Sequence, residues 1–288
     1  MTSKVVLITG CSTGIGRTTA QHLAAKGHTV YATARKVDTI ADLEADGCHL
    51  LALDVTDDES MVAAVSAVEA EHGAVGALVN NAGYSQGGPV EEVPLDVARR
   101  QFETNVFGLA RMCQLVLPAM REQRSGRIVN LSSMGGRMTF PGGGWYHATK
   151  HAVEALSDAL RFEVRPFGID VVVIEPGVVV TAFGDTAVAS AGDASDRAGP
   201  YDRMMASVVT KTAGAYVKPK RGAGITPEAV ARRIEQSLSR RHPRPRRIVG
   251  AQARQILGVR AVLPDRAWDR FLATHFEPPR PESRPSAS

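Results

Sequence analysis

The chain has 288 residues, 44% of them hydrophobic, so it can bury one large core and is short enough for a single α/β domain. Its three scattered cysteines indicate neither a disulfide framework nor a zinc site, and a reducing, cytoplasmic location is expected. The start of the chain lacks the features of a signal peptide, and no apolar run reaches transmembrane length. The net charge is +4, and the basic excess is local, because residues 231–260 carry nine arginines and one glutamate. Nucleic-acid binding therefore has little support.

Short apolar runs rich in β-branched residues recur through the chain and predict buried strands. The runs cover 5–9, 29–33, 50–53, 77–80, 127–131 and 169–174, with helical patterns between them at 14–26, 57–72, 95–121 and 145–167. This alternation predicts right-handed βαβ units and a Rossmann-type doubly wound parallel sheet of about seven strands with helices on both faces. A short strand at 247–249 is expected to close one edge of the sheet.

The pattern weakens between residues 181 and 224, around a stretch rich in Gly, Ala, Ser and Asp at 187–199. In a compact domain this predicts a mobile substrate lid over about 181–224, with disorder as the alternative. Residues 277–288 contain four prolines and are expected to form a disordered tail. Residues 1–276 are therefore predicted to form one dinucleotide-binding and catalytic domain.

A glycine-rich loop follows the first predicted strand and opens the first predicted helix. Glycines at this place let the backbone turn tightly and expose amide groups to a pyrophosphate. The spacing differs by one inserted residue from the common GxGxxG fingerprint, so the loop is a variant of that solution, and an ordinary strand-to-helix turn is the alternative. The loop predicts a cofactor site that includes Gly10, Ser12, Thr13, Gly14, Ile15 and Gly16.

The end of the second predicted strand indicates which dinucleotide is bound. Ala34 occupies the position where a carboxylate would accept hydrogen bonds from the hydroxyls of the adenosine ribose, and Arg35 is the next residue. A guanidinium pairs well with a 2′-phosphate, so NADP(H) is expected as the preferred cofactor and NAD(H) as a second possibility. Arg17 and Lys36 either assist or are solvated surface cations.

Two further turns lie at the carboxyl edge where such sheets bind ligands. Asp54, followed by Val55, is predicted to accept a hydrogen bond from the adenine amino group, and a helix cap near residue 57 is its alternative role. The Asn81, Ala82 and Gly83 turn is predicted to bring backbone close to the cofactor, with an ordinary turn as the alternative.

Tyr146 and Lys150 lie four residues apart in a predicted helix and therefore share one face. A free tyrosine titrates near pH ~10, too high for proton exchange at neutrality. A fixed positive charge about 5 Å away, at an effective dielectric constant near 20, contributes roughly 3 kcal/mol, or about two pH units. Lys150, together with oxidised nicotinamide, is thus expected to lower the pKa of Tyr146 into a working range.

Two more polar residues complete the predicted catalytic group. Ser133 is favoured over the adjacent Ser132 to hydrogen-bond the substrate oxygen, and Asn105 is expected to hold a water that links Lys150 to solvent. Taken singly, each of these residues also fits a structural role. Together they predict a phenol that exchanges the proton and a cofactor that carries the hydride, so no metal is needed.

These motifs together resemble the short-chain dehydrogenase/reductase family over roughly residues 4–185. The resemblance implies a catalytic tetrad of Asn105, Ser133, Tyr146 and Lys150, of which the last two also contact the cofactor. It further implies that the segment after the sixth strand holds the nicotinamide carboxamide, through Pro176, Gly177, Val179 and Thr181. The helices that carry Asn105 and Tyr146 usually form subunit interfaces in this family, so a homodimer or homotetramer is expected.

Within the family, the sequence looks like the branch of hydroxysteroid and retinol dehydrogenases, which implies a hydrophobic alcohol or ketone as substrate. His147 and Thr149 depart from the commoner serines beside the tyrosine, and both are expected to point away from the phenol. An apolar pocket is predicted from residues that also fit core packing, namely Met134, Met138, Phe140, Trp145, Phe183, Met204 and Met205.

The arginine-rich segment and the apolar residues after it, from Ile256 to Leu272, are expected to pack on the core or on a second subunit, with an amphipathic membrane-surface element as the alternative. The sequence as a whole predicts an NADP-dependent oxidoreductase acting on an alcohol or carbonyl. Two alternatives stay open, a non-catalytic NADP-sensing module and an epimerase or dehydratase on the same scaffold.

Overall fold

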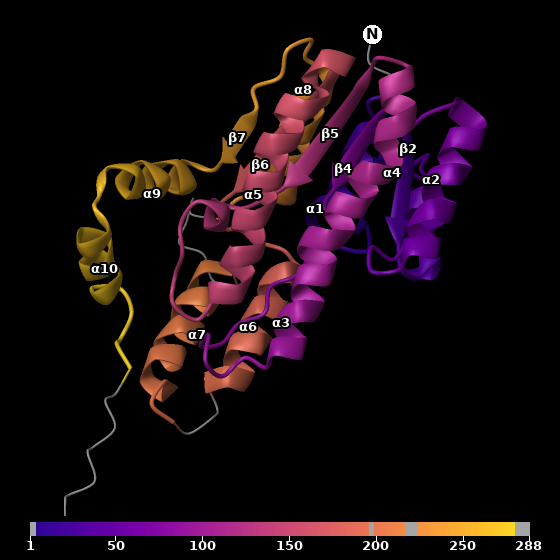
Figure 1. Cartoon of the computed structure of the whole chain (residues 1–288). Helices are drawn as coiled ribbons and strands as arrows, with labels where there is room; N and C mark the ends of the chain where they lie inside the picture. Colours follow the sequence, from indigo (N-terminus) through magenta and orange to yellow (C-terminus); the bar gives the residue numbers. More distant parts are fainter. Residues whose placement is uncertain (1–3, 196–198, 217–223, 280–288) are drawn as a thin grey trace, which may run out of the picture.

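The computed structural model describes residues 4–195, 199–216 and 224–279. Its centre is a parallel sheet of seven strands in the order β3-β2-β1-β4-β5-β6-β7 (Figure 1), which confirms the predicted doubly wound architecture. The strands are β1 (Val5–Ile8), β2 (Thr29–Ala34), β3 (His49–Ala52), β4 (Ala77–Asn80), β5 (Gly126–Leu131), β6 (Ile169–Pro176) and β7 (Arg246–Val249).

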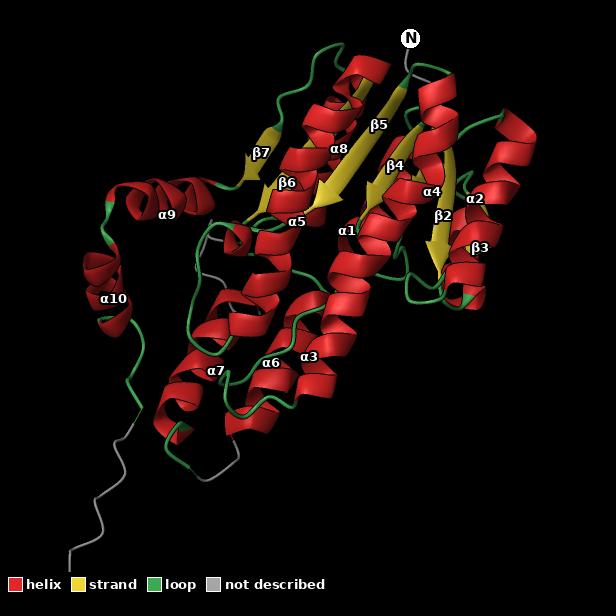
Figure 2. Cartoon of the chain, viewed as in Figure 1, coloured by secondary structure: helices red, strands yellow, loops and turns green. Residues whose placement is uncertain are grey.

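Helices cover both faces of the sheet, as the red and yellow elements of Figure 2 show. Leu7 and Ile8 are neighbours in β1 but lie in different hydrophobic clusters, because successive side chains of a strand point to opposite faces. The Ile8 cluster includes α1 (Gly14–Ala24) and α8 (Pro227–Ser239). The Leu7 cluster includes α2 (Asp58–His72), α4 (Leu109–Glu122) and α5 (Gly144–Val164).

The single helix predicted over 95–121 is wrong in one respect. The structure has α3 (Leu95–Phe102), a π-helical segment (Glu103–Gly108) and then α4. A Cβ on Gly108 would lie 2.2 Å from the Val55 carbonyl oxygen, so the chain passes close to the β3–α2 loop at this point. The wider turn carries Asn105, and π-helical segments of this kind occur often at functional sites.

The weakly patterned region contains two helices, α6 (Ala182–Ser195) and α7 (Asp202–Tyr216). The two helices lie beyond the carboxyl ends of the strands in Figure 1. Ala191 packs against Met204, Met205 and Val208, which makes a small apolar core of their own. Residues 196–198 and 217–223 of the predicted lid lie outside the described residues, and its role as a lid stays a prediction.

The C-terminal region continues from β7 into α9 (Ala251–Val262) and α10 (Asp265–Ala273). Leu257 and Trp268 are buried against Met138, which supports the prediction that the C-terminal segment packs on the core. Val262 in the same segment is 77% exposed. The predicted tail begins in ordered contact, since the Glu277 carboxylate pairs with Arg203 at 3.3 Å, while residues 280–288 lie outside the described residues. Within the described ranges, no helix combines the length and apolarity needed to cross a membrane.

Candidate active site

The glycine loop forms a cradle that larger residues would fill. Gly10 and Gly14 adopt positive φ angles of 74° and 59°, a region that disfavours side chains. A Cβ on Gly16 would lie 2.3 Å from the Gly10 carbonyl oxygen and 2.4 Å from Asn81 Nδ2. The loop therefore stays open only with glycine at these positions, and this fits a dinucleotide pyrophosphate against the start of α1.

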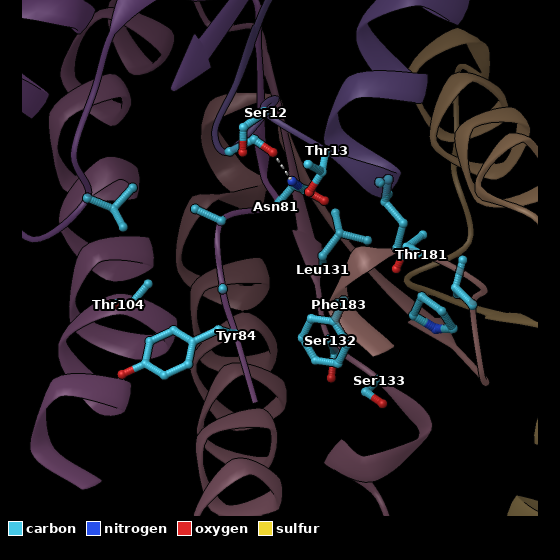
Figure 3. A pocket seen from close by; sticks show the side chains of 18 of the residues that line it. Ser12, Thr13, Asn81, Tyr84, Thr104, Leu131, Ser132, Ser133, Thr181 and Phe183 are labelled. Atoms are coloured by element: carbon cyan, nitrogen blue, oxygen red, sulfur yellow. Dashed lines mark hydrogen bonds between the residues drawn. The ribbon is translucent and has the colours of Figure 1, made fainter. Parts of the chain in front are cut away.

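A set of hydrogen bonds joins this loop to the turn after β4. Thr9 Oγ1 accepts from the backbone amides of Asn81 and Ala82, both at 3.0 Å. Asn81 Nδ2 donates to the carbonyl oxygens of Thr9 and Gly10, both at 2.9 Å. A dashed line in Figure 3 marks one of the hydrogen bonds of Asn81. Because both turns are tied together, the backbone next to a bound cofactor is held in place before binding.

A cavity of about 330 Å³ lies above these turns. Of the residues predicted for cofactor binding and catalysis, all but Gly16 and Asn105 line it. Gly16 is packed behind the loop, and Asn105 is only 1% exposed. The lining also includes residues that the sequence did not single out for this site, namely Leu53, Thr56, Tyr84, Thr104, Leu131 and Tyr216.

Arg35 lines the cavity, is exposed and forms no ion pair with any described residue. Arg17 is paired with Asp42 instead, so its guanidinium is already occupied. The cap of α2 is Asp57, whose carboxylate accepts from the amides of Glu59 and Ser60, so the alternative role of Asp54 as that cap is wrong. Asp54 lines the cavity and accepts from Thr56.

The residues of the predicted tetrad meet at the carboxyl ends of β4 and β5. Ser133 and Tyr146 both line the cavity, and the Ser133 hydroxyl, which accepts from the Gly135 amide at 3.1 Å, lies near enough to the phenol to lower its pKa. Lys150 Nζ lies 5.9 Å from the centroid of the Tyr146 ring and donates to the Leu131 carbonyl oxygen at 2.8 Å. Ser132 Oγ is buried without a hydrogen-bond partner among the described residues, and Ser133 is the serine that influences the pKa of the phenol.

The electrostatics of this group differ from the expectation. Burial raises the pKa of Tyr146 above its usual value near 10, the neighbouring Tyr216 raises it further, and the Ser133 hydroxyl opposes them. Burial also lowers the pKa of Lys150 to about 8, while Glu154, one turn further along α5, raises it. The predicted lowering of the Tyr146 pKa is therefore wrong for the cofactor-free chain, because the low-dielectric surroundings disfavour both charged forms.

Asn105 makes a set of direct contacts. Its Oδ1 accepts from the Tyr84 amide at 3.0 Å, and its Nδ2 donates to the Tyr84 carbonyl oxygen at 2.9 Å. Nδ2 also donates to Thr149 Oγ1 at 3.1 Å. In the ligand-free chain this amide thus anchors the loop after Gly83 to α5, and its predicted link from Lys150 to water stays a prediction.

His147 and Thr149 do not line the cavity, and their orientation away from the phenol stays a prediction, but both contact residues around the site. Thr149 accepts the bond from Asn105, and the His147 ring lies 5.7 Å from the Tyr146 ring, centroid to centroid. His147 Nδ1 accepts from the Phe140 amide at 3.3 Å, and burial lowers the pKa of this imidazole to about 4. A Cβ on Gly135 would lie 2.6 Å from the imidazole, so neutral His147 supports the loop that follows Ser133.

Of the predicted substrate-pocket residues, only Phe183 lines the cavity, with its ring 5.8 Å from Tyr146. Met138 packs on the C-terminal helices, and Met205 lies in the small core of α6 and α7. The ring of Tyr216 lies next to that of Phe183, with 6.4 Å between the two ring centroids. No periodicity marked Tyr216, whereas Tyr84 directly follows the predicted Asn-Ala-Gly turn and could have been included.

Comparison with known proteins agrees with this arrangement. Residues 4–191 match the family model for short chain dehydrogenase. The uncharacterised oxidoreductase YusZ of Bacillus subtilis is 34% identical over 281 residues, 94% of this chain and 98% of the relative. A 3-ketodihydrosphingosine reductase of Bacteroides thetaiotaomicron is 43% identical over 186 residues, 64% and 67% of the two chains.

Two further matches cover nearly the whole chain. An NADPH-dependent 3-dehydrocapnine reductase of Ornithobacterium rhinotracheale is 32% identical over 278 residues, 93% of this chain and 96% of the relative. The crystal structure of a short-chain dehydrogenase from Streptomyces avermitilis superposes with a TM-score of 0.75 at 34% identity, covering 94% and 98%. The chain therefore belongs to the short-chain dehydrogenase family and is an NAD(P)-dependent oxidoreductase.

Proposed function

We propose that this enzyme uses NADPH to reduce a ketone on a long hydrophobic molecule to an alcohol, and that the same groups serve the reverse oxidation. The observation that carries the proposal is that Ser133, Tyr146 and Lys150 meet in one cavity with the glycine loop. These groups supply a bond to the substrate oxygen, a proton and a compensating charge.

The chemistry divides between cofactor and protein. Bound NADPH supplies the hydride. Ser133 Oγ holds the ketone oxygen, and Tyr146 Oη donates the proton to it. The Lys150 ammonium, fixed on the Leu131 carbonyl oxygen, offsets the charge left on the phenolate. With its pKa raised by burial, Tyr146 is protonated at neutral pH and can donate its proton to the ketone oxygen.

The surroundings of the phenol support an apolar substrate. Phe183 and Tyr216 line the same cavity as Tyr146, and both belong to the α6–α7 pair that we interpret as the lid. The two reductases named above act on 3-ketodihydrosphingosine and 3-dehydrocapnine. The first of these compounds is a long-chain amine with a ketone at carbon 3, so a long-chain 3-ketone is the substrate class proposed here.

We expect the substrate class to be visible in the dependence of rate on chain length. With NADPH, kcat/KM for 3-hexadecanone should exceed that for 3-pentanone by at least about a hundredfold, since each buried methylene contributes roughly 0.8 kcal/mol. The measurement is the loss of NADPH absorbance, and short aldehydes such as butanal serve as a further comparison. If a broad panel of long and short ketones consumed no NADPH, the proposal would give way to a sensing module or an epimerase.

The cofactor preference is assigned to Arg35, which is exposed at the end of β2 without an ion-pair partner among the described residues. Arg35→Ala should weaken NADPH binding by about tenfold to a hundredfold, because one charge-assisted pair with the 2′-phosphate is lost, and should leave NADH binding nearly unchanged. Fluorescence titration of both cofactors measures this. Lys26→Ala, which removes an exposed cation after α1, is the control, and an equal loss for both cofactors would contradict the assignment.

Self-association is also part of the proposal. Phe107 in the π-helical segment is 56% exposed, and Phe162 on α5 is 84% exposed. Large apolar side chains that are left in solvent on the two helices flanking the site favour a subunit interface. A homodimer or homotetramer that buries this face accounts for their exposure.

A further inference from the structure

A second cavity, of about 480 Å³, lies at the carboxyl ends of β6 and β7. It is bordered by residues at or near the starts of α8 and α9, which adjoin the strand β7 in Figure 1. Gly177 lines both this cavity and the cofactor cavity, so the two are neighbours across one turn of backbone. The proposed ketone reduction leaves this second cavity without a role.

The second cavity is strongly cationic. Arg232, Arg233 and Arg254 line it, and none of the described lining residues is acidic. None of the three arginines forms an ion pair with a residue in the described part of the chain. Gly250, at the start of α9, provides no side-chain cap, so the first amides of that helix add positive potential on the same side.

Arg247, on β7, adds to this uncompensated charge from beside the cavity, which it does not line. Its side chain is partly buried, and its Nε and Nη2 have no hydrogen-bond partner among the described residues. Burial lowers the pKa of this guanidinium, and the like charges of Arg240, Arg244 and Arg233 lower it further. An anion bound nearby would reduce the repulsion among these charges.

Arg233 joins the two observations, because it lines the cavity and also acts on Arg247. We propose that the groove between α8, β7 and α9 is a binding site for a phosphate oxyanion, held by Arg233 and Arg254 and separate from the cofactor cavity. The phosphate belongs either to a free phosphorylated metabolite or to the headgroup of an anionic lipid. The site does not depend on ketone reduction by the enzyme.

The test uses the full chain saturated with NADP+, so that phosphate cannot enter the cofactor cavity. Inorganic phosphate is titrated at constant ionic strength and its binding followed by calorimetry. Arg254→Gln and Arg233→Gln should each weaken binding by about tenfold or more, as expected for the loss of one charge-assisted contact. Arg99→Gln removes an exposed arginine of α3, remote in the fold from this groove, and should leave binding unchanged.

A second arm separates the two sources of the phosphate. Sedimentation with phosphatidylglycerol vesicles, compared with phosphatidylcholine vesicles, tests a lipid headgroup. Binding of either probe that depends on Arg254 supports the site and identifies the source. The proposal is overturned if neither inorganic phosphate nor phosphatidylglycerol binds saturably, or if Arg99→Gln weakens binding as much as Arg254→Gln.

Discussion

Tyr146→Phe should lower the turnover number for ketone reduction by about 10²- to 10⁴-fold, the usual contribution of a positioned proton donor. The substitution removes only the phenolic hydroxyl, and it keeps the ring that packs against His147 and Phe183. NADPH affinity should therefore change by less than about tenfold, the equivalent of one hydrogen bond. Steady-state turnover and a cofactor titration on the same preparation measure both quantities.

Tyr216→Phe is the matched control for that experiment. Tyr216 lines the same cavity, and burial raises its pKa to about 12, but it has no contact with Ser133 or Lys150 in the described structure. Loss of its hydroxyl should lower turnover by less than about tenfold, the effect of one polar contact. If Tyr146→Phe were no slower than Tyr216→Phe, Tyr146 would not be the proton donor.

The fold could be predicted because its determinants are local in sequence. Each strand is a short run of β-branched residues between helices of suitable length, and the handedness of βαβ units leaves few ways to arrange them. The glycine loop could be recognised for the same reason, since its requirements come from adjacent backbone atoms. Gly10 and Gly14 adopt the positive φ angles that only glycine tolerates well.

The errors fall where distant segments decide the structure. The π-helical turn depends on a close approach between Gly108 and Val55, which no helical periodicity encodes. His147 packs against the loop that follows Ser133, a contact that sequence spacing does not reveal. Tyr216 reaches the cavity through the placement of α7, and its neighbours in sequence carry no signal of that role.

The pKa of Tyr146 is a more instructive error. A charge placed about 5 Å away in a uniform medium lowers the pKa of a phenol by roughly two units. In the folded chain the phenol and the ammonium are both buried, and desolvation acts on each in the direction that opposes its charge. The sequence spacing thus predicts that the two groups meet, whereas their protonation depends on everything packed around them.

That protonation leads to a second large effect, at Lys150. Its pKa of about 8 means that the ammonium is present below pH 8 and is lost as the pH rises through that value. Without the ammonium, the phenolate that remains after proton donation loses its compensating charge. We therefore expect log kcat/KM for ketone reduction, at saturating NADPH, to be flat near neutrality and to fall as a single ionisation near pH 8.

Lys150→Met should remove this inflection and lower kcat/KM at neutral pH by about 10²- to 10³-fold, the effect of removing one preorganised electrostatic group. Methionine fills a similar volume, and Lys26→Met, an exposed lysine after α1, controls for the loss of charge alone. If the native enzyme kept its rate well above pH 8, or if Lys150→Met retained the same inflection, another group would have to control the proton. An electrostatic role of Lys150 predicts that the substitution lowers the rate and removes the inflection together. A purely structural role predicts a lower rate with an unchanged pH profile.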